Sequence, residues 1–171
     1  TGNPSNEASA LSLSTSTCHD CNSPSFNEER VTDEFPLVIA GKAFKLPSHT
    51  NKIDTVSART GTAFPIKLSL YDDNGPSHIQ HVALYLNLKD HQITGSQSDT
   101  YIIWEKGNEV VVHDPHGFLK DAKVTAQISA EDNMELEVIF DLFFVKPLEK
   151  SHIIISMWDD RRNGSVTKIF D

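Results

Sequence analysis

The stretch Ser77-His-Ile-Gln-His-Val-Ala-Leu-Tyr-Leu-Asn-Leu88 alternates apolar and polar side chains. One side carries Val82, Leu84, Leu86 and Leu88, and the other carries His81, Ala83, Tyr85 and Asn87. An alternation with period two over this length is typical of a β-strand that buries one face in a core. The stretch therefore predicts a strand whose leucines point inward, and it brings two histidines to the beginning of that strand.

Comparable segments recur from Phe35 to the end of the chain, separated by turn-forming residues. We predict a hairpin over 36–47, a polar edge strand over 54–60, strands over 64–71 and 77–88, a hairpin over 101–113, and strands over 124–128, 134–142, 153–158 and 166–170. No segment has the pattern of an amphipathic helix long enough to be stable. The expected fold is therefore an all-β, immunoglobulin-like β-sandwich of about nine or ten strands over residues 35–171.

Apolar packing alone must stabilise such a core, because the predicted strands lack the cysteine pair of immunoglobulin domains. Trp104 and Trp158 are expected to anchor it. The 171 residues suit one domain with an appendage, and 38% of them are apolar. A net charge of −9 argues against nucleic acid and anionic membrane surfaces as partners. No apolar run approaches the roughly 20 residues of a transmembrane segment, and the first residues lack a signal-peptide pattern.

Residues 1–34 are rich in Ser, Thr, Asn and Glu and read as an irregular N-terminal tail or linker. This segment contains the only two cysteines, in the motif Cys18-His19-Asp20-Cys21. A local disulfide between Cys18 and Cys21 is one interpretation. A metal clip that uses both thiolates and His19 is a second, and it needs a fourth ligand from elsewhere. A thioredoxin-like redox pair is disfavoured, because no strand–helix unit follows the motif.

Four of the eight histidines form two pairs with two intervening residues, His78/His81 and His113/His116. Imidazole is a common ligand of zinc and copper. Residues three apart on a strand face opposite sides, so the members of a pair can share a metal only if one of them lies in a turn. Pro76 and Pro115 make this plausible for both pairs. Asp114 is a candidate ligand or an orienting partner of a histidine.

Other chemistry has less support in the sequence. His91 and His152 are weaker candidate ligands, and His49 is not expected to take part. The carboxylate clusters at 72–74 and 159–160 could hold calcium, but Asp and Asn at such positions usually serve the turn itself. The motifs of serine hydrolases, phosphate-binding loops and zinc proteases are absent, so we expect no catalysis. A type 1 copper site is disfavoured, because it needs a cysteine beside the histidines.

Four phrases carry a resemblance to a known family: His81-Val-Ala-Leu-Tyr-Leu-Asn-Leu88, Ser98-Asp-Thr-Tyr-Ile-Ile-Trp-Glu-Lys106, Asp114-Pro-His-Gly-Phe118 and Ile153-Ile-Ile-Ser-Met-Trp-Asp159. Together they make residues 36–171 similar to a secreted β-sandwich domain of ammonia-oxidising archaea that often stands beside a cupredoxin domain. The resemblance implies an extracellular or cell-surface location and a possible link to copper or electron-transfer proteins. It supplies no catalytic residues.

The leading hypothesis from the sequence is an extracytoplasmic domain that binds a zinc or copper ion through His81 and His116, with help from His78 and His113. Its role would be metal capture, storage or structural stabilisation. One alternative is a cell-surface interaction or adhesion module that binds another protein and no metal. The other is an accessory domain of a redox protein of the cupredoxin type.

Overall fold

The computed structural model describes residues 24–26, 35–46, 50–53, 56–130, 133–161 and 164–170. The helices in these segments are two short 3-10 turns, Pro76–His78 (η1) and Gly95–Gln97 (η2). No helix in this part of the chain is long and apolar enough to cross a membrane. Four residues named above as candidate or rejected ligands lie outside the described residues: Cys18, His19, Cys21 and His49.

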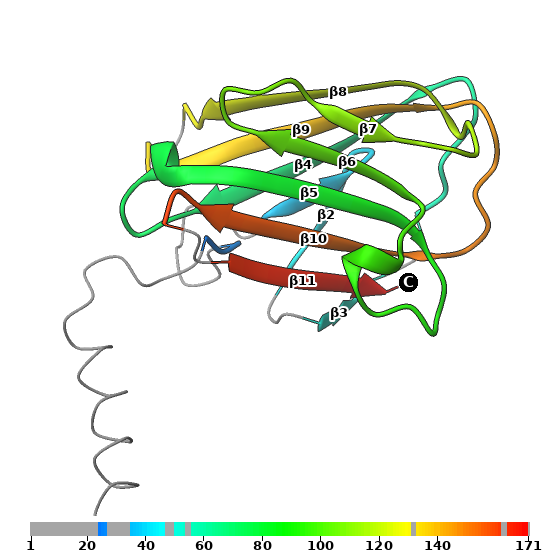
Figure 1. Cartoon of the computed structure of the whole chain (residues 1–171), viewed down its shortest axis with the longest axis horizontal. Coiled ribbons are helices and arrows are strands. Elements are labelled where there is room, and N and C mark those ends of the chain that lie inside the picture. Colours follow the sequence, from blue (N-terminus) through cyan, green and yellow to red (C-terminus); the bar gives the residue numbers. More distant parts are fainter. Residues whose placement is uncertain are drawn as a thin grey trace, which may run out of the picture.

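Two β-sheets face each other (Figure 1). The first has the order β2-β1-β4-β9-β8, with bounds Lys42–Phe44, Leu37–Ile39, Ala63–Tyr71, Glu135–Phe144 and Leu119–Ile128. The second has the order β3-β11-β10-β5-β6-β7, with bounds Thr50–Lys52, Gly164–Phe170, His152–Asp159, Ile79–Leu88, Thr100–Glu105 and Val111–His113. Neighbouring strands are antiparallel except β3 and β11, which are parallel.

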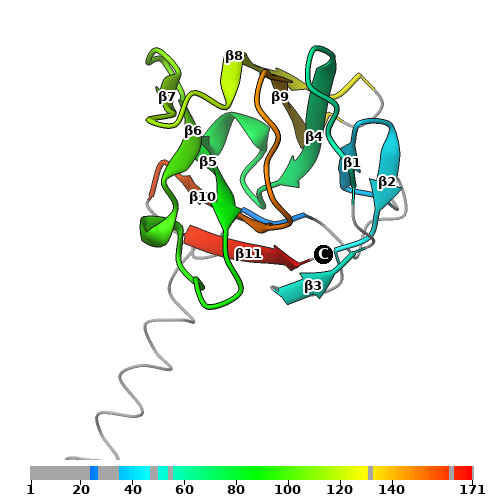
Figure 2. The same cartoon turned by 90° about the vertical axis from the view of Figure 1, so that its right-hand side faces the viewer.

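Nine of the eleven strands follow the order of a variable-type immunoglobulin domain, and β2 and β3 are additional edge strands. The run β1-β4-β9-β8 corresponds to strands A, B, E and D, and the run β11-β10-β5-β6-β7 corresponds to G, F, C, C′ and C″. Figure 2 shows the two layers from one end, with β4 and β9 in one and β10 and β11 in the other. The predicted all-β sandwich is confirmed, with eleven strands in the described residues where about nine or ten were expected.

One predicted strand is wrong. Residues 56–60 form no strand, and the edge of the second sheet is instead Thr50–Lys52. These three residues pair in parallel with Lys168, Ile169 and Phe170 at the end of β11. Which segment forms this edge strand depends on a pairing partner more than one hundred residues away in the sequence. The local alternation of side chains carries no information about that partner.

Strand β5 has the two faces that its alternation predicts. Val82, Leu84 and Leu86 are at most 4% exposed and belong to the main core cluster. The pattern ends at Asn87, whose φ of 56° is left-handed, close to a shift in the pairing of β5 with β10. Leu88 is fully buried but does not join that core cluster. The expectation that all four apolar residues share one core was therefore wrong at Leu88.

The two tryptophans lie on different faces of the second sheet. Trp104 pairs with Val82 and packs, partly buried, against the core, as predicted. Trp158 pairs with His81 and stacks on its ring, so it lies on the outer face of the sheet. The prediction that Trp158 anchors the core is wrong, and Met157 fills that role because it is the neighbour that points inward.

A short piece of the predicted tail packs on the sandwich. Ser25 forms an isolated antiparallel bridge with Tyr71, and the hydroxyl of Ser165 donates a hydrogen bond of 2.7 Å to the carbonyl of Pro24. Phe26 is only 5% exposed and belongs to the core cluster. Residues 24–26 therefore add to the sandwich although they precede the expected domain boundary at residue 35.

Candidate functional site

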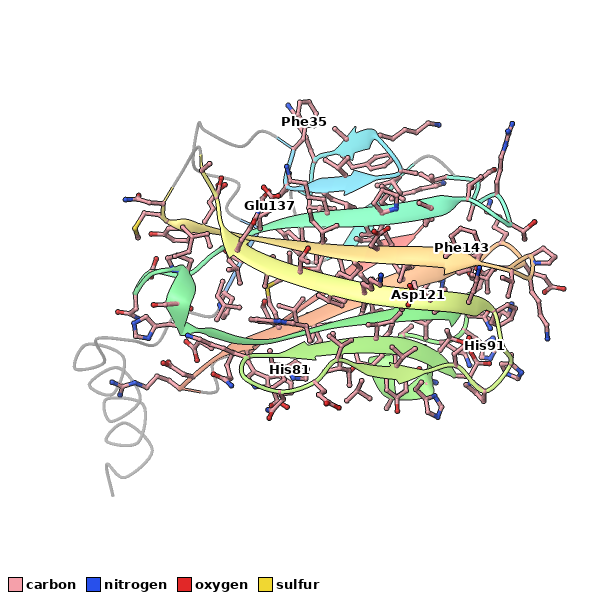
Figure 3. All side chains as sticks on the ribbon, turned by 90° about the horizontal axis from the view of Figure 1, so that it is seen from above. Phe35, His81, His91, Asp121, Glu137 and Phe143 are labelled. Carbon is pink, nitrogen blue, oxygen red and sulfur yellow. The ribbon has the colours of Figure 1, made fainter. Side chains whose placement is uncertain are left out.

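The two histidine pairs lie toward opposite ends of the second sheet. His81 pairs with Glu105, and His113 pairs with Tyr101, four residues further along β6. Their backbones are therefore about 13 Å apart along the strands and two strand spacings of about 4.8 Å apart across them. Two imidazoles cannot reach one metal ion over this separation, because zinc–nitrogen bonds are only about 2.0–2.1 Å long. Figure 3 shows His81 well apart from His91, which lies in the loop after β5.

His78 and His81 do not face each other. His78 lies in η1, and its Nδ1 atom is 3.0 Å from Oδ2 of Asp160. His81 lies on β5, where its ring stacks on Trp158 with centroids 3.4 Å apart and an interplanar angle of 8°. The 3-10 turn ends at His78 and β5 begins at the next residue, so the two histidines contact different neighbours.

His81 is a buried histidine. It is 5% exposed, and neither ring nitrogen has a hydrogen-bond partner among the described residues. Burial lowers the pKa of His81, and the charge of Glu105 only partly opposes this effect. The ring therefore acts as an aromatic side chain against Trp158, and it is poorly placed for a ligand arriving from solvent.

His113 and His116, by contrast, converge on one residue, Asp99. The Nδ1 atom of His113 is 3.1 Å from the backbone oxygen of Asp99, and Nε2 of His116 is 2.8 Å from its carboxylate oxygen Oδ2. Asp99 ends the loop before β6, His113 ends β7, and His116 lies in the turn that follows β7. The β6–β7 pairing brings these two segments together.

Neighbouring side chains hold both rings in place. Tyr101 stacks on His113 with centroids 4.6 Å apart and an interplanar angle of 12°. Phe118 lies beside His116 at 5.7 Å. Lys146 donates a hydrogen bond of 2.9 Å to the carbonyl oxygen of His116. The turn is thus held in place at His116 by contacts with Phe118 and Lys146.

Asp114 shapes this turn from within. Its two carboxylate oxygens accept hydrogen bonds from the backbone N–H groups of Phe118 and Leu119, at 3.0 and 2.8 Å. Both oxygens are therefore engaged with the backbone, and Asp99, not Asp114, is the carboxylate that orients a histidine.

Asp99 is held as a carboxylate. Its partial burial would raise the pKa, but hydrogen bonds from Asn87, Thr100 and His116 and the charge of His116 together lower it. Sequence reasoning missed Asp99, which stands in a polar loop with no motif around it. The one available signal was its position directly before a strand that pairs with the strand of His113.

These contacts decide which ring nitrogens can bind a metal. A carbonyl or carboxylate oxygen only accepts, so Nδ1 of His113 and Nε2 of His116 carry the hydrogens. In the neutral form of each ring, the lone pair then lies on Nε2 of His113 and on Nδ1 of His116. An oxygen that accepts from the second nitrogen is the usual partner of a metal-ligating histidine, because it fixes the tautomer and increases the basicity of the ring.

The described residues contain no group of three or more His, Cys, Asp or Glu side chains that could hold a metal ion. The Asp99 end presents two candidate nitrogen ligands, Nε2 of His113 and Nδ1 of His116. The other candidates are engaged elsewhere: His152 is buried with Nε2 at 2.7 Å from the carbonyl of Gln92, and Asp72 and Asp159 accept backbone hydrogen bonds within their own turns. His91 is exposed.

Comparison of the chain with protein-family models, with curated proteins and with solved structures gave no match. The resemblance to an archaeal secreted domain therefore stays a prediction.

Proposed function

We propose that this protein is a non-catalytic, extracytoplasmic binding domain that holds a zinc or copper ion with His113 and His116. The observation that carries the proposal is the pair of hydrogen bonds by which Asp99 orients both imidazoles. Imidazole suits both metals, and the sequence alone does not choose between them.

The exposure of the site supports reversible capture. The side chain of His116 is 55% exposed, and that of Asp99 is 42% exposed. Structural zinc sites are usually closed by four protein ligands, whereas sites with open positions exchange their ligands. The net charge of −9 favours the approach of a cation over long range. Metal capture or delivery therefore fits this site better than structural stabilisation.

The proposal moves the metal to one end of the sheet. The original hypothesis combined His81 with His116, and the two lie too far apart to share one ion. His78 and His81 consequently become a matched control, because they form the same spacing in the sequence at the other end of the sheet.

The test is an equilibrium titration with zinc and with copper against a chromophoric chelator, on protein prepared without a histidine tag. We expect the variant His113→Ala/His116→Ala to lose the high-affinity site, and the control His78→Ala/His81→Phe to keep it. Metal bound by the first variant as tightly as by the wild type would refute the site. Loss of the high-affinity metal site in Cys18→Ser/Cys21→Ser alone would instead favour the cysteine motif as the metal site.

A second candidate is the interaction module, favoured by the variable-type strand order. At the end opposite Asp99, the turn after β4 is tied to the turn after β10 by the His78–Asp160 contact, and to Lys106 by its hydrogen bond to the Ser77 carbonyl. A photo-crosslinker at Asp73 in this end should capture a defined cell-surface protein, whereas the same group at Asp121 on β8 should not. Equal crosslinking at both positions would argue against this candidate.

A further inference from the structure

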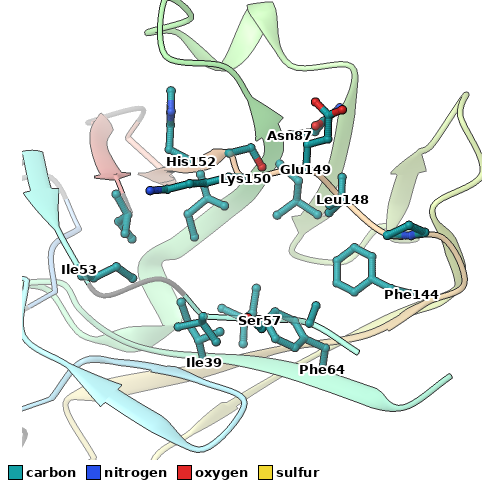
Figure 4. A pocket seen from close by; sticks show the side chains of 18 of the residues that line it. Ile39, Ile53, Ser57, Phe64, Asn87, Phe144, Leu148, Glu149, Lys150 and His152 are labelled. Carbon is teal, nitrogen blue, oxygen red and sulfur yellow. The ribbon is translucent and has the colours of Figure 1, made fainter. Parts of the chain in front are cut away.

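A pocket of about 310 Å³ opens between the two sheets at the end where the β9–β10 connection crosses from one sheet to the other. Its walls come from both sheets and include Ile39, Phe64, Ile66, Leu86, Phe144 and Ile169. Each of these side chains is at most 8% exposed. Figure 4 shows Ile39 and Phe64 on one side of the space, and Asn87, Lys150 and His152 on the other.

The volume of this pocket is large enough for a small ligand. An enclosed apolar cavity of about 150 Å³ is sufficient to bind benzene, so the apolar part of this pocket has room for a ring or a short alkyl chain. Clefts for small ligands start at about 300 Å³, with apolar walls and a few polar groups.

The polar groups stand at the mouth. Asn87, Lys146, Glu149 and Lys150 line the pocket there. Glu149 is 3.5 Å from the ammonium group of Lys89, which offsets its charge. Lys146 and Lys150 therefore leave an excess of positive charge around the opening, in a protein whose total charge is −9. An apolar interior below a cationic rim matches an amphipathic anion.

We propose that this pocket binds an amphipathic monocarboxylate, with its alkyl or aryl body between the sheets and its carboxylate at the mouth beside Lys150. The site is separate from the proposed metal ligands and does not require a bound metal. Lys146 contacts His116 by a hydrogen bond from its side-chain ammonium group to the backbone carbonyl oxygen, and this bond does not use the imidazole ring.

The test uses 2-naphthoate and decanoate as probes, with 2-naphthalenemethanol as the uncharged analogue. Binding to the full chain is followed by isothermal titration calorimetry in a buffer with EDTA. Measurements on His113→Ala/His116→Ala separate this site from the metal site, because that variant should bind both acids as the wild type does.

Two kinds of variant test the two parts of the pocket. Ile39→Phe and Ile66→Phe each fill the space from a different position, and whichever variant keeps the wild-type circular dichroism should lose saturable binding of both acids. Lys150→Met keeps the length of the side chain and removes its charge. It should weaken the affinity for 2-naphthoate by about two- to fivefold, which is the effect of a partly exposed ion pair. The affinity for 2-naphthalenemethanol should stay unchanged. Lys123→Met on β8 is the control and should change neither.

Three results would overturn the proposal. The first is the absence of saturable binding of both acids to the wild type. The second is unchanged binding in a folded filling variant, which would place the probe elsewhere. The third is equal binding of acid and alcohol with no effect of Lys150→Met, which would exclude recognition of the carboxylate.

Discussion

The Nε2 atom of His116 donates a hydrogen bond of 2.8 Å to the carboxylate of Asp99, and so joins the turn after β7 to the loop before β6. The same aspartate accepts from His113 through its backbone oxygen. One residue thus orients both histidines of the second pair. A substitution of the Asp99 side chain changes only the contact with His116, because His113 bonds to the backbone oxygen.

Asp99→Asn should weaken zinc or copper binding by about 10- to 100-fold, because the loss of an orienting partner usually has an effect of this size. The substitution keeps the shape of the side chain and removes its charge. Competition titration against a chelator measures the change. Asp90→Asn, in the exposed part of the same loop, should have no effect. An unchanged affinity in Asp99→Asn would show that the hydrogen bond to His116 does not support a metal.

His81 should make the fold less stable in mild acid. Burial holds its pKa in the folded state below the ordinary value of 6.5. The unfolded chain therefore binds the proton more readily, and stability falls as the pH drops through about 6.5 and levels off below the folded-state pKa. The wild type should lose more stability than His81→Phe between pH 7.5 and pH 5.5. Urea unfolding at several pH values tests this, and equal losses in the two proteins would contradict it.

His81→Phe should also stabilise the protein at pH 7.5. Both ring nitrogens of His81 are buried without a hydrogen-bond partner among the described residues, and a buried unsatisfied polar group costs about 1–3 kcal/mol. Phenylalanine keeps the aromatic contact with Trp158 and removes this cost. The expected gain is about 1 kcal/mol in the free energy of unfolding. A loss of stability would mean that the imidazole has a polar partner.

Gly95→Ala should destabilise the loop that covers Tyr85. A Cβ atom at Gly95 would lie 2.7 Å from the ring of Tyr85, which itself packs on Tyr101 with centroids 5.6 Å apart. Overpacking of this kind costs about 1–3 kcal/mol. Gly164→Ala is the control, because its Cβ would meet neighbours only at the ordinary distances of 3.6 and 3.8 Å.

A double variant tests the cause of this effect. The cost of Gly95→Ala should shrink when Tyr85 is first replaced by leucine, because the two sites are in contact and their effects do not add. Thermal unfolding of the wild type, the two single variants and the double variant gives the coupling free energy between the two sites. Additive effects would show that the ring of Tyr85 is not the obstacle.

Asn87 should reverse the usual order of glycine and alanine in a strand. Its φ of 56° costs an alanine about 1–2 kcal/mol of steric strain, which a glycine does not have. Both substitutions remove the hydrogen bond from Asn87 to Asp99. Asn87→Gly should therefore be more stable than Asn87→Ala by about 1 kcal/mol in urea unfolding. The opposite order would contradict the left-handed backbone.

Much of the fold was predictable, because the side-chain alternation of a strand reflects its own two faces. Val82, Leu84 and Leu86 show this on β5. The prediction failed where the pairing partner decides the outcome: at β3, which takes its place beside β11, and at Leu88, beyond the left-handed Asn87. The prediction that Trp158 anchors the core failed for a simpler reason. Its size suggested a core residue, but the strand register puts it opposite His81 on the outer face.

The candidate site was predictable only in its parts. The spacing of His113 and His116 marked them as possible ligands. Nothing in the spacing showed that they would converge on Asp99, or that His81 would lie about 13 Å further along the sheet.

The sequence by itself determined the all-β class, the inward and outward faces of the central strands and the residue types available for chemistry, because each depends on neighbours in the chain. The tertiary structure alone decided which histidines meet, which carboxylate orients them and where the two sheets leave a pocket. These features depend on strand register and on loops that cross between sheets, so they arise from residues far apart in the sequence.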